Sequence, residues 1–376
     1  MEELVVNAEF WKGRRVLVTG HTGFKGSWLA LWLVSMGAKV AGLGLPPTSQ
    51  PNLYGILGLV DRCHSVIDDI NRPGALVDAI RDFEPEVVFH MAAQAVVLTS
   101  YDDPVGTYET NVMGVVRLLD AVRVSRSVRS VVVVTSDKCY ENREQIWGYR
   151  ETDAMGGHDP YSSSKGAAEI AAQSMQRSFF RPFVAQGHPA RIATVRAGNV
   201  IGGGDWSPNR IVPDIIRGLL GPEGAVRLRN PKAIRPWQHV LEPLSAYLQI
   251  AELLCAAPTG IDEAWNIGPD NSDTRPVMEL AQALAIALGT GRLIVETNAS
   301  DLHEATLLTL DCTKARTKLG WRPRLMFDDC VRWTAEWYAA WYGRHDMTEF
   351  TLRQIALFGT MKAKLDHRAY VETYGP

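Results

Sequence analysis

The amino-acid sequence predicts an α/β protein built on a doubly wound parallel sheet. Four short runs are rich in valine, isoleucine or phenylalanine and are bounded by turn residues: Arg15 to Thr19, Glu86 to His90, Val131 to Thr135 and Ile192 to Arg196. Such continuous apolarity is typical of strands buried on both faces of a parallel sheet. Because segments of helix length separate the runs, we expect helices on both faces.

Length and composition are those of an ordinary globular protein. The chain has 376 residues, 46% hydrophobic and 22% charged, which favours one large or two closely packed domains. A net charge of −3 and a pI of about 6.3 give no indication of a basic binding surface. We therefore expect neither nucleic acid nor a membrane as a partner.

The N-terminus and the cysteines indicate a cytoplasmic protein. The first ten residues, MEELVVNAEF, are acidic and lack the long apolar core of a signal peptide. The five cysteines are odd in number and form no CxxC pair, which favours reduced thiols over a disulfide framework or a zinc site. We expect no bound metal.

The first predicted strand runs into a glycine-rich turn, GHTGFKG, and then into an apolar helical segment. Gly20 permits a tight turn, Gly23 lets the backbone approach a pyrophosphate, and Gly26 lets helix and strand pack closely. Phe24 and Lys25 stand in the same turn. Lys25 either adds positive charge beside the pyrophosphate or points to solvent. The arrangement predicts a Rossmann-type dinucleotide site.

The next predicted strand, residues 39–45, favours NAD over NADP. It ends without an Asp or Glu for the adenosine ribose, and also without a basic residue for a 2′-phosphate. Asp69 and Ile70, in the stretch DDIN, follow a third strand-like run and are expected to meet the adenine instead.

A second motif, DPYSSSKGAAE, places Tyr161 and Lys165 four residues apart at the start of a helix. Residues i and i+4 share one helix face, so the phenol and the ammonium are expected to face one site. A free phenol has a pKa of about 10, and a nearby ammonium favours its ionised form. The pair is therefore suited to take a proton from a hydroxyl while hydride leaves the adjacent carbon.

The glycine turn, HMAAQ, TNVMG, the strand ending in TSDKCY, and YSSSK together resemble the extended short-chain dehydrogenase/reductase family, over residues 12–342. The longer strings TSDKCYENRE, RAGNVIGGGDW and RPWQHVLEPL are similar, within that family, to those of the CDP-glucose 4,6-dehydratases. The resemblance adds Ala92, Ala93 and Gln94 to the expected NAD-binding residues.

The resemblance implies an internal redox cycle that feeds deoxysugar biosynthesis. NAD⁺ removes hydride from C4 of CDP-glucose, water leaves across C5 and C6, and hydride returns to C6, which makes CDP-4-keto-6-deoxyglucose. Tyr161, with Lys165, takes the 4-hydroxyl proton, Ser136 binds the C4 oxygen, and Asp137 protonates the leaving hydroxyl. Lys138 departs from the family, which carries glutamate there. It acts either as the C5 base or as a cation that stabilises the enolate.

Substrate contacts are expected after the last of these strands. The resemblance assigns Asn199 to the sugar or phosphate, and Arg235 suits a pyrophosphate because guanidinium matches phosphate oxygens in a fork. Arg210 is a second candidate. We predict an NAD-binding domain over 1–198, with a return near 236–268, and a nucleotide-sugar-binding region over 199–235 and 269–376.

Two other functions are compatible with the same motifs. One is a different sugar-nucleotide enzyme, such as a 4-epimerase, although Asp137 favours elimination because an epimerase protonates no leaving hydroxide. The other is a non-catalytic NAD-sensing protein on the same fold, although this would have no need of Tyr161 and Lys165. The family resemblance also implies a homodimer or homotetramer.

Overall fold

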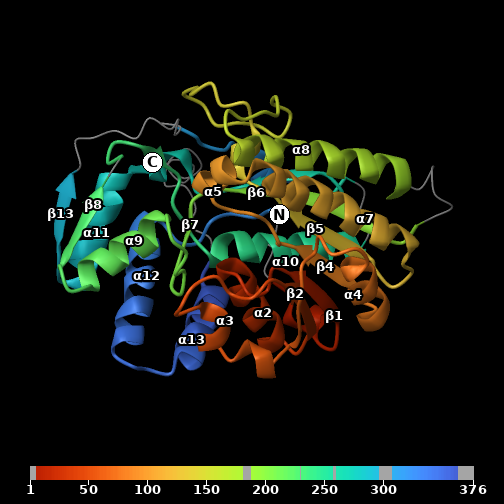
Figure 1. Cartoon of the computed structure of the whole chain (residues 1–376), viewed down its shortest axis with the longest axis horizontal. Helices are drawn as coiled ribbons and strands as arrows, with labels where there is room; N and C mark the ends of the chain where they lie inside the picture. The colour runs from red at the N-terminus through yellow and green to blue at the C-terminus, as the bar shows by residue number, and fades with distance from the viewer. Residues whose placement is uncertain (1–5, 181–187, 229, 257–259, 296–306, 363–376) are drawn as a thin grey trace, which may run out of the picture.

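A seven-stranded sheet forms the centre of the protein (Figure 1), which we describe from a computed structural model covering residues 6–180, 188–228, 230–256, 260–295 and 307–362. All neighbouring strands are parallel, in the order β11-β6-β5-β4-β1-β2-β3. The strands are β1 (Arg15–Thr19), β2 (Lys39–Gly44), β3 (His64–Ile67), β4 (Val87–His90), β5 (Ser130–Val134), β6 (Arg191–Ala197) and β11 (Ala264–Ile267). The predicted fold class is confirmed.

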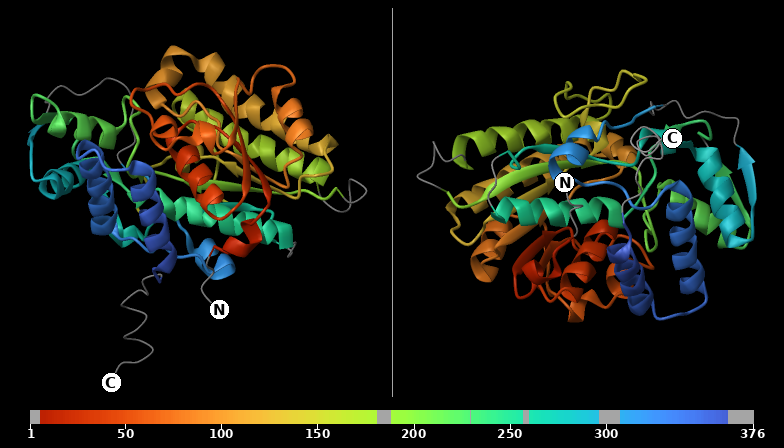
Figure 2. Two further views of the ribbon diagram at one scale, coloured as in Figure 1. Left: turned by 90° about the horizontal axis from the view of Figure 1, so that it is seen from below. Right: turned by 180° about the vertical axis from the view of Figure 1, so that it is seen from behind.

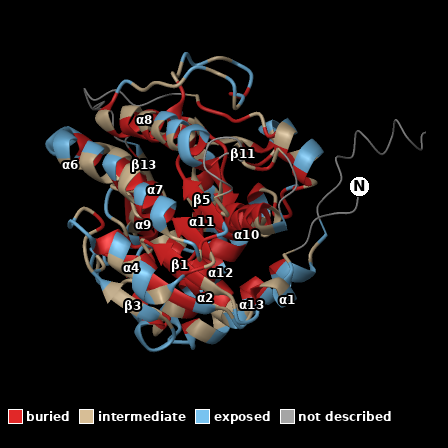
Figure 3. Ribbon diagram, turned by 90° about the vertical axis from the view of Figure 1, so that its right-hand side faces the viewer, coloured by how far each residue is buried: buried red, intermediate tan, exposed pale blue. Residues whose placement is uncertain are grey.

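Helices cover both faces of the sheet because its strands are apolar on both sides. Val16 and Val18 of β1 pack into one core cluster with α2 (Phe24–Ser35) and α10 (Leu241–Ala256). Leu17, between them, packs into the opposite cluster with α4 (Ala75–Phe83) and α7 (Gly114–Val124). The helix of the YSSSK motif, α8 (Pro160–Met175), lies on this second side, and Figure 3 shows the strands buried beneath half-exposed helices.

A second group of elements lies together at one end of the molecule (Figure 2). It contains α9 (Ile211–Leu220), a parallel pair of β8 (Ala225–Leu228) and β13 (Arg292–Val295), α11 (Val277–Leu288), α12 (Phe327–Tyr342) and α13 (Met347–Thr360). One core cluster runs from α2 and α10 into these helices. The predicted division into two domains stays a prediction, and its outermost residues, 1–5 and 363–376, lie outside the described ranges.

Shorter elements connect these layers. They are the helices α1 (Ala8–Trp11), α3 (Leu53–Ile56), α5 (Val97–Asp102) and α6 (Pro104–Tyr108), and the two-residue strands β7 (Val200–Ile201), β9 (Ile234–Arg235), β10 (Gln238–His239) and β12 (Arg275–Pro276).

No helix within the described ranges combines the length and apolarity needed to cross a membrane.

The sheet order locates the site. Because all strands are parallel, the segments that follow β1, β4, β5 and β6 emerge at the same edge. The order of strands reverses between β1 and β4, and ligands of open α/β sheets bind in the crevice outside the carboxyl ends at such a point.

Candidate active site

A cavity of about 800 Å³ lies at this edge, between the sheet and the second group of elements. It is lined from the glycine turn, from the segments after β4, β5 and β6, from α8 and from the loops around α9. Ten of the predicted site residues line it, namely Lys25, Ala93, Ser136, Asp137, Lys138, Tyr161, Lys165, Asn199, Arg210 and Arg235. The cavity therefore unites predicted residues from distant parts of the chain.

The glycine turn has the shape that a dinucleotide pyrophosphate needs. Gly20 has a φ of +74°, and a Cβ there would lie 2.8 Å from the amide nitrogen of Ala92. A Cβ on Gly26 would lie 2.1 Å from the carbonyl oxygen of Gly20. Helix α2 starts at Phe24, and its N-cap residue, Gly23, has no side chain to bind the first amides. Those amides remain available to phosphate oxygens.

The other residues predicted to bind the cofactor lie outside the cavity lining but near the same sheet edge. Asp69 and Ile70 follow β3; the Asp69 carboxylate accepts the amide of Asn71, and Ile70 is buried. Ala92 donates its amide to Thr19 Oγ1. Gln94 is held by the Asn111 carboxamide. The predicted residues outside the lining are thus Gly20, Gly23, Phe24, Gly26, Asp69, Ile70, Ala92 and Gln94.

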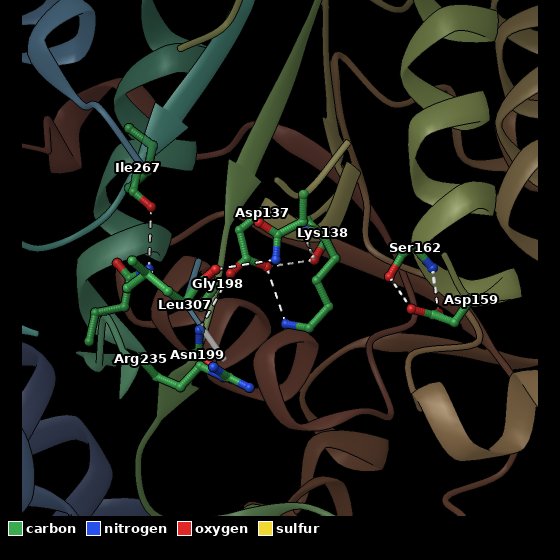
Figure 4. A network of polar contacts seen from close by, with 12 residues as sticks. Asp137, Lys138, Asp159, Ser162, Gly198, Asn199, Arg235, Ile267 and Leu307 are labelled. Atoms are coloured by element: carbon green, nitrogen blue, oxygen red, sulfur yellow. Dashed lines mark hydrogen bonds and ion pairs between the residues drawn. The ribbon is translucent and has the colours of Figure 1, made fainter. Parts of the chain in front are cut away.

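Ser136, Asp137 and Lys138 follow β5 directly and form a compact polar group (Figure 4). Ser136 Oγ accepts the amide of Lys138 at 3.2 Å and donates to Asp137 Oδ1 at 3.0 Å. Lys138 Nζ lies 3.4 Å from the same oxygen, and Asn199 Nδ2 lies 3.4 Å from Oδ2. The Asp137 side chain is 1% exposed, whereas that of Lys138 is 30% exposed. The buried carboxyl group of Asp137 thus faces the cavity beside the more exposed ammonium group of Lys138.

Gly198 makes the room for Asp137, and we did not predict its importance from the sequence. A Cβ at this position would lie 1.8 Å from Asp137 Oδ2. Gly198 precedes Asn199 in RAGNV, but nothing in that string shows that residue 137 packs against it. The contact is formed only when β5 and β6 pair side by side.

Tyr161 and Lys165 are buried on one face of α8, as the spacing predicts. Asp159 caps this helix by accepting hydrogen bonds from the amide and hydroxyl of Ser162. Burial raises the pKa of the Tyr161 phenol, while the Lys138 ammonium and a hydrogen bond with Ser136 act in the opposite direction. Burial lowers the pKa of Lys165 to about 8 despite the opposing charge of Glu169.

Lys25 is half-buried and lines the cavity, so of the two predicted orientations it does not adopt the one toward bulk solvent. Its Nζ lies 5.9 Å from the centroid of the Tyr247 ring. Burial, Arg210 and Lys165 lower its pKa to about 7, against the opposing effect of Asp137. The glycine turn therefore places a cation inside the site.

Replacement of Lys25 by methionine is expected to raise the melting temperature at acidic pH. The folded-state pKa lies below that of a free lysine, so charging Lys25 destabilises the folded protein, fully below about pH 7 and less as pH rises. We expect a gain of roughly 2–5 °C at about pH 6 that shrinks toward pH 10. Calorimetry at a series of pH values measures the melting temperatures. The control is Lys39→Met, at an exposed lysine, which is expected to change the melting temperature little at any pH. An equal gain for Lys25→Met at all pH values contradicts the prediction.

Two arginines, Arg235 and Arg210, line the end of the cavity near Asn199. Arg235 is buried and donates to the carbonyl of Ile234, and its guanidinium lies on the same side of the site as Asn199 (Figure 4). Arg210 lies 3.6 Å from the carboxylate of Asp205. Asp205 is a buried lining residue that sequence reasoning passed over, although it stands in GGGDW. Tyr101 and Asn142 also line the cavity; Asn142 stands in the string TSDKCYENRE without having been singled out, and Tyr101 stands in none of the quoted motifs.

Comparison with known proteins agrees with this geometry. The family described as GDP-mannose 4,6 dehydratase matches residues 17–334. CDP-glucose 4,6-dehydratase of Salmonella typhimurium is 46% identical over 352 residues, which cover 94% of this chain and 98% of that protein.

Solved structures share the fold. UDP-glucose 4-epimerase of Thermotoga maritima, with UDP-glucose, has a TM-score of 0.74 at 22% identity, covering 87% of this chain and 99% of the other. UDP-glucose 4-epimerase of Thermus thermophilus, in complex with NAD, has a TM-score of 0.69 at 25% identity, covering 86% and 98%. Because the family model matches residues 17–334 and the Salmonella typhimurium relative is 46% identical over 94% of the chain, the chain belongs to the GDP-mannose 4,6 dehydratase family.

Proposed function

We propose that this protein converts CDP-D-glucose to CDP-4-keto-6-deoxy-D-glucose and uses NAD as a resident cofactor. The observation that carries the proposal is one cavity in which a buried carboxylic group, Asp137, stands among Ser136, Lys138 and Tyr161. An acid at this position suits loss of a hydroxyl group, which epimerisation does not require. The 46% identity to a CDP-glucose 4,6-dehydratase supports the choice of CDP-glucose.

The glycine turn, the free amides of α2 and the segments after β3 and β4 are proposed to hold NAD. The turn leaves no room for a side chain at Gly20 or Gly26, so it stays tight and packs closely against the strand, as a dinucleotide-binding turn requires. Residues 1–198 with the return near 236–268 are proposed as the cofactor domain. Bound NAD⁺ would supply hydride acceptance from C4 and hydride return to C6.

Tyr161 and Ser136 are proposed to act on the C4 oxygen. Tyr161 takes the 4-hydroxyl proton, and Ser136 orients that oxygen from the end of β5. Because burial disfavours phenolate, Tyr161 depends on the cations of the site, and Lys138 and Arg210 both lower its pKa. Lys165, one helical turn away, adds a further buried cation to the same wall.

Asp137 and Lys138 are proposed to carry the elimination. Lys138 takes the C5 proton, and Asp137 protonates the departing 6-hydroxyl. Their contact of 3.4 Å allows the Lys138 ammonium first to pass a proton to Asp137. The neutral amine can then take the C5 proton while the carboxylic acid gives its proton to the leaving hydroxyl, so that the pair ends the step as an ammonium and a carboxylate, as it began. Asn199 and Ser136 hold the Asp137 carboxyl group in place on either side.

Arg235, Arg210 and Asn199 are proposed to bind the diphosphate and sugar of the substrate, as part of a nucleotide-sugar-binding region over 199–235 and 269–376. Guanidinium groups match phosphate oxygens in a bidentate fork. A cytoplasmic homodimer or homotetramer, with no nucleic-acid or membrane partner, is part of the same proposal.

Replacement of Lys138 by alanine is expected to spare NAD binding and to slow hydrogen exchange at C5 by about 10²–10⁴-fold, the usual contribution of an acid–base group. NMR of CDP-4-keto-glucose or of the turnover mixture in deuterated water measures the exchange, and NAD titration calorimetry is the control. Unchanged exchange removes Lys138 from the mechanism. The control substitution Lys39→Ala, on an exposed lysine of β2, is expected to change neither.

The function itself is tested by incubating the protein with NAD⁺ and CDP-glucose in deuterated water and following the sugar by NMR. UDP-glucose, dTDP-glucose and GDP-mannose are run in parallel. A 4-keto-6-deoxy product from CDP-glucose with deuterium at C5 supports the proposal. Turnover of a different nucleotide sugar contradicts the substrate, and epimerisation without dehydration contradicts the reaction.

A further inference from the structure

A buried ion pair lies directly behind the cavity, and the proposed reaction makes no use of it. Glu169 of α8 and Arg196 of β6 are both 0% exposed and meet at 2.8 Å. Glu169 Oε1 also accepts from Thr135 Oγ1 at 2.5 Å, and Oε2 accepts from Thr194 Oγ1 at 2.7 Å. Arg196 Nη1 donates to the hydroxyl of Tyr140 at 2.6 Å.

The position of this pair in the chain relates it to the site. Glu169 stands four residues after Lys165 and eight after Tyr161, so the three share one face of α8. Thr135 immediately precedes Ser136, and Arg196 is followed two residues later by Gly198. One carboxylate therefore joins the helix of Tyr161 and Lys165 to the ends of the two strands that carry the rest of the site.

Burying two charges costs desolvation free energy that their mutual attraction can fail to offset. Replacement of a buried ion pair by apolar residues is often neutral or stabilising, so packing alone does not require one. A buried carboxylate does have one effect that an apolar side chain lacks, which is to stabilise a neighbouring cation. Lys165, itself 5% exposed, is the cation one helical turn away.

We propose that Glu169, held by Arg196, is a positioning residue for the reaction: it keeps Lys165 as an ammonium inside the cavity wall and aligns α8 with the ends of β5 and β6. The proposal goes beyond the proposed function and rests on it for the role of Lys165. Glu169 does not itself line the cavity; it acts through two lining residues, Lys165 and Thr135, and accepts a hydrogen bond from Thr135.

The charges around the pair agree with this assignment. Burial opposes the ionisation of Glu169, but Arg196 and the two threonine hydroxyls outweigh it and lower its pKa. Burial lowers the pKa of Lys165 to about 8, and Glu169 is the strongest opposing influence. Among the described residues, the titratable groups from other elements that act on these three or feel their charge include Cys139, Tyr140, Glu151, His90 and Lys25.

The test is a Glu169→Gln variant, with the Lys165 titration followed by NMR of isotope-labelled lysine side chains. The Lys165 signal is assigned by its absence in Lys165→Met. Loss of the carboxylate removes the strongest influence that opposes the effect of burial on Lys165, so we expect the Lys165 midpoint to fall by one pH unit or more. With CDP-glucose as substrate, the alkaline limb of kcat should move to lower pH by a similar amount, with KM changed less than twofold.

Three further variants separate this role from a purely structural one. Glu169→Asp keeps the charge and should keep the midpoint near that of the wild type. Glu151→Gln removes a different carboxylate, on the other side of Arg196, and should leave the Lys165 midpoint unchanged. If Glu169→Gln does not fold, the double variant Glu169→Gln/Arg196→Gln removes both charges and should show a smaller shift in the same direction.

An unmoved Lys165 midpoint in folded Glu169→Gln, or in the double variant if the single variant does not fold, overturns the proposal, even if activity falls. Because the NMR titration needs no substrate, it is decided separately from the function. A wild-type protein that fails to dehydrate CDP-glucose, with a shifted midpoint in Glu169→Gln, leaves the pair's effect on Lys165 established and refutes the proposed function.

Discussion

Replacement of Tyr161 by phenylalanine is expected to lower turnover of CDP-glucose by about 10²–10⁴-fold while leaving the fold intact. The phenol is the group that takes the 4-hydroxyl proton in the proposed cycle, and Glu169, the carboxylate on the same face of α8, does not line the cavity. The ring is retained, so the packing of this buried side chain changes little. Without proton removal at O4, no hydride leaves C4, and neither ketone nor product forms.

The measurement combines product NMR with the absorbance of reduced nicotinamide in a single turnover. Both signals should be lost together, because the block precedes the first hydride transfer. Tyr108→Phe is the matched control: its hydroxyl donates to Ser163 of the same helix, but the ring is at the surface, 38% exposed. A Tyr161→Phe variant that keeps more than about a tenth of wild-type turnover would mean that another group removes the proton.

Replacement of Gly198 by alanine is expected to stop the cycle after its first half. The new methyl group would lie 1.8 Å from Asp137 Oδ2 and 2.2 Å from Cγ, so the carboxyl group must move. Its other oxygen is held by Ser136, so any rotation also disturbs the contacts with Lys138 and Asn199. A displacement of about 1 Å in a catalytic group costs on the order of 10²-fold in rate.

The two halves of the cycle report separately on this variant. C4 oxidation should persist, so reduced nicotinamide accumulates, whereas the 4-keto-6-deoxy product falls by about 10²-fold. Asp137→Asn should behave in the same way, because it removes the same acid without crowding. Gly359→Ala on α13 is the control, since a Cβ there meets nothing within 4 Å. Equal loss of oxidation and elimination would show that Gly198 matters for folding rather than for Asp137.

Much of this architecture was predictable because local patterns determine it. Continuous apolar runs predicted buried parallel strands, and the family resemblance assigned Ser136 and Asn199. The parallel sheet then places both residues, after β5 and β6, at the same edge as the glycine turn. The spacing of Tyr161 and Lys165 predicted a shared helix face. Those inferences need only the periodicity of a strand or helix and the direction of the chain.

The remaining features depend on contacts between segments that the sequence does not pair. Gly198 is needed only because β6 lies beside β5, and Glu169 meets Arg196 only because α8 packs across both strands. Lys25 was left with two orientations, since a helix start does not tell which way a long side chain turns. Asp205 and Asn142 reach the cavity from loops and Tyr101 from the short helix α5, and the position of each follows from tertiary packing.

The position of β11 has a consequence for how this protein is made. Its residues, Ala264–Ile267, pair with Thr194–Ala197 of β6, a strand that the ribosome completes much earlier. At about 5–20 residues per second, β6 waits several seconds with one row of backbone groups unpaired. Such an open edge can associate with another chain. The seven-stranded sheet is therefore complete only after residues 264–267 have been synthesised. The residues up to the end of β6 cannot complete this sheet by themselves while they leave the ribosome.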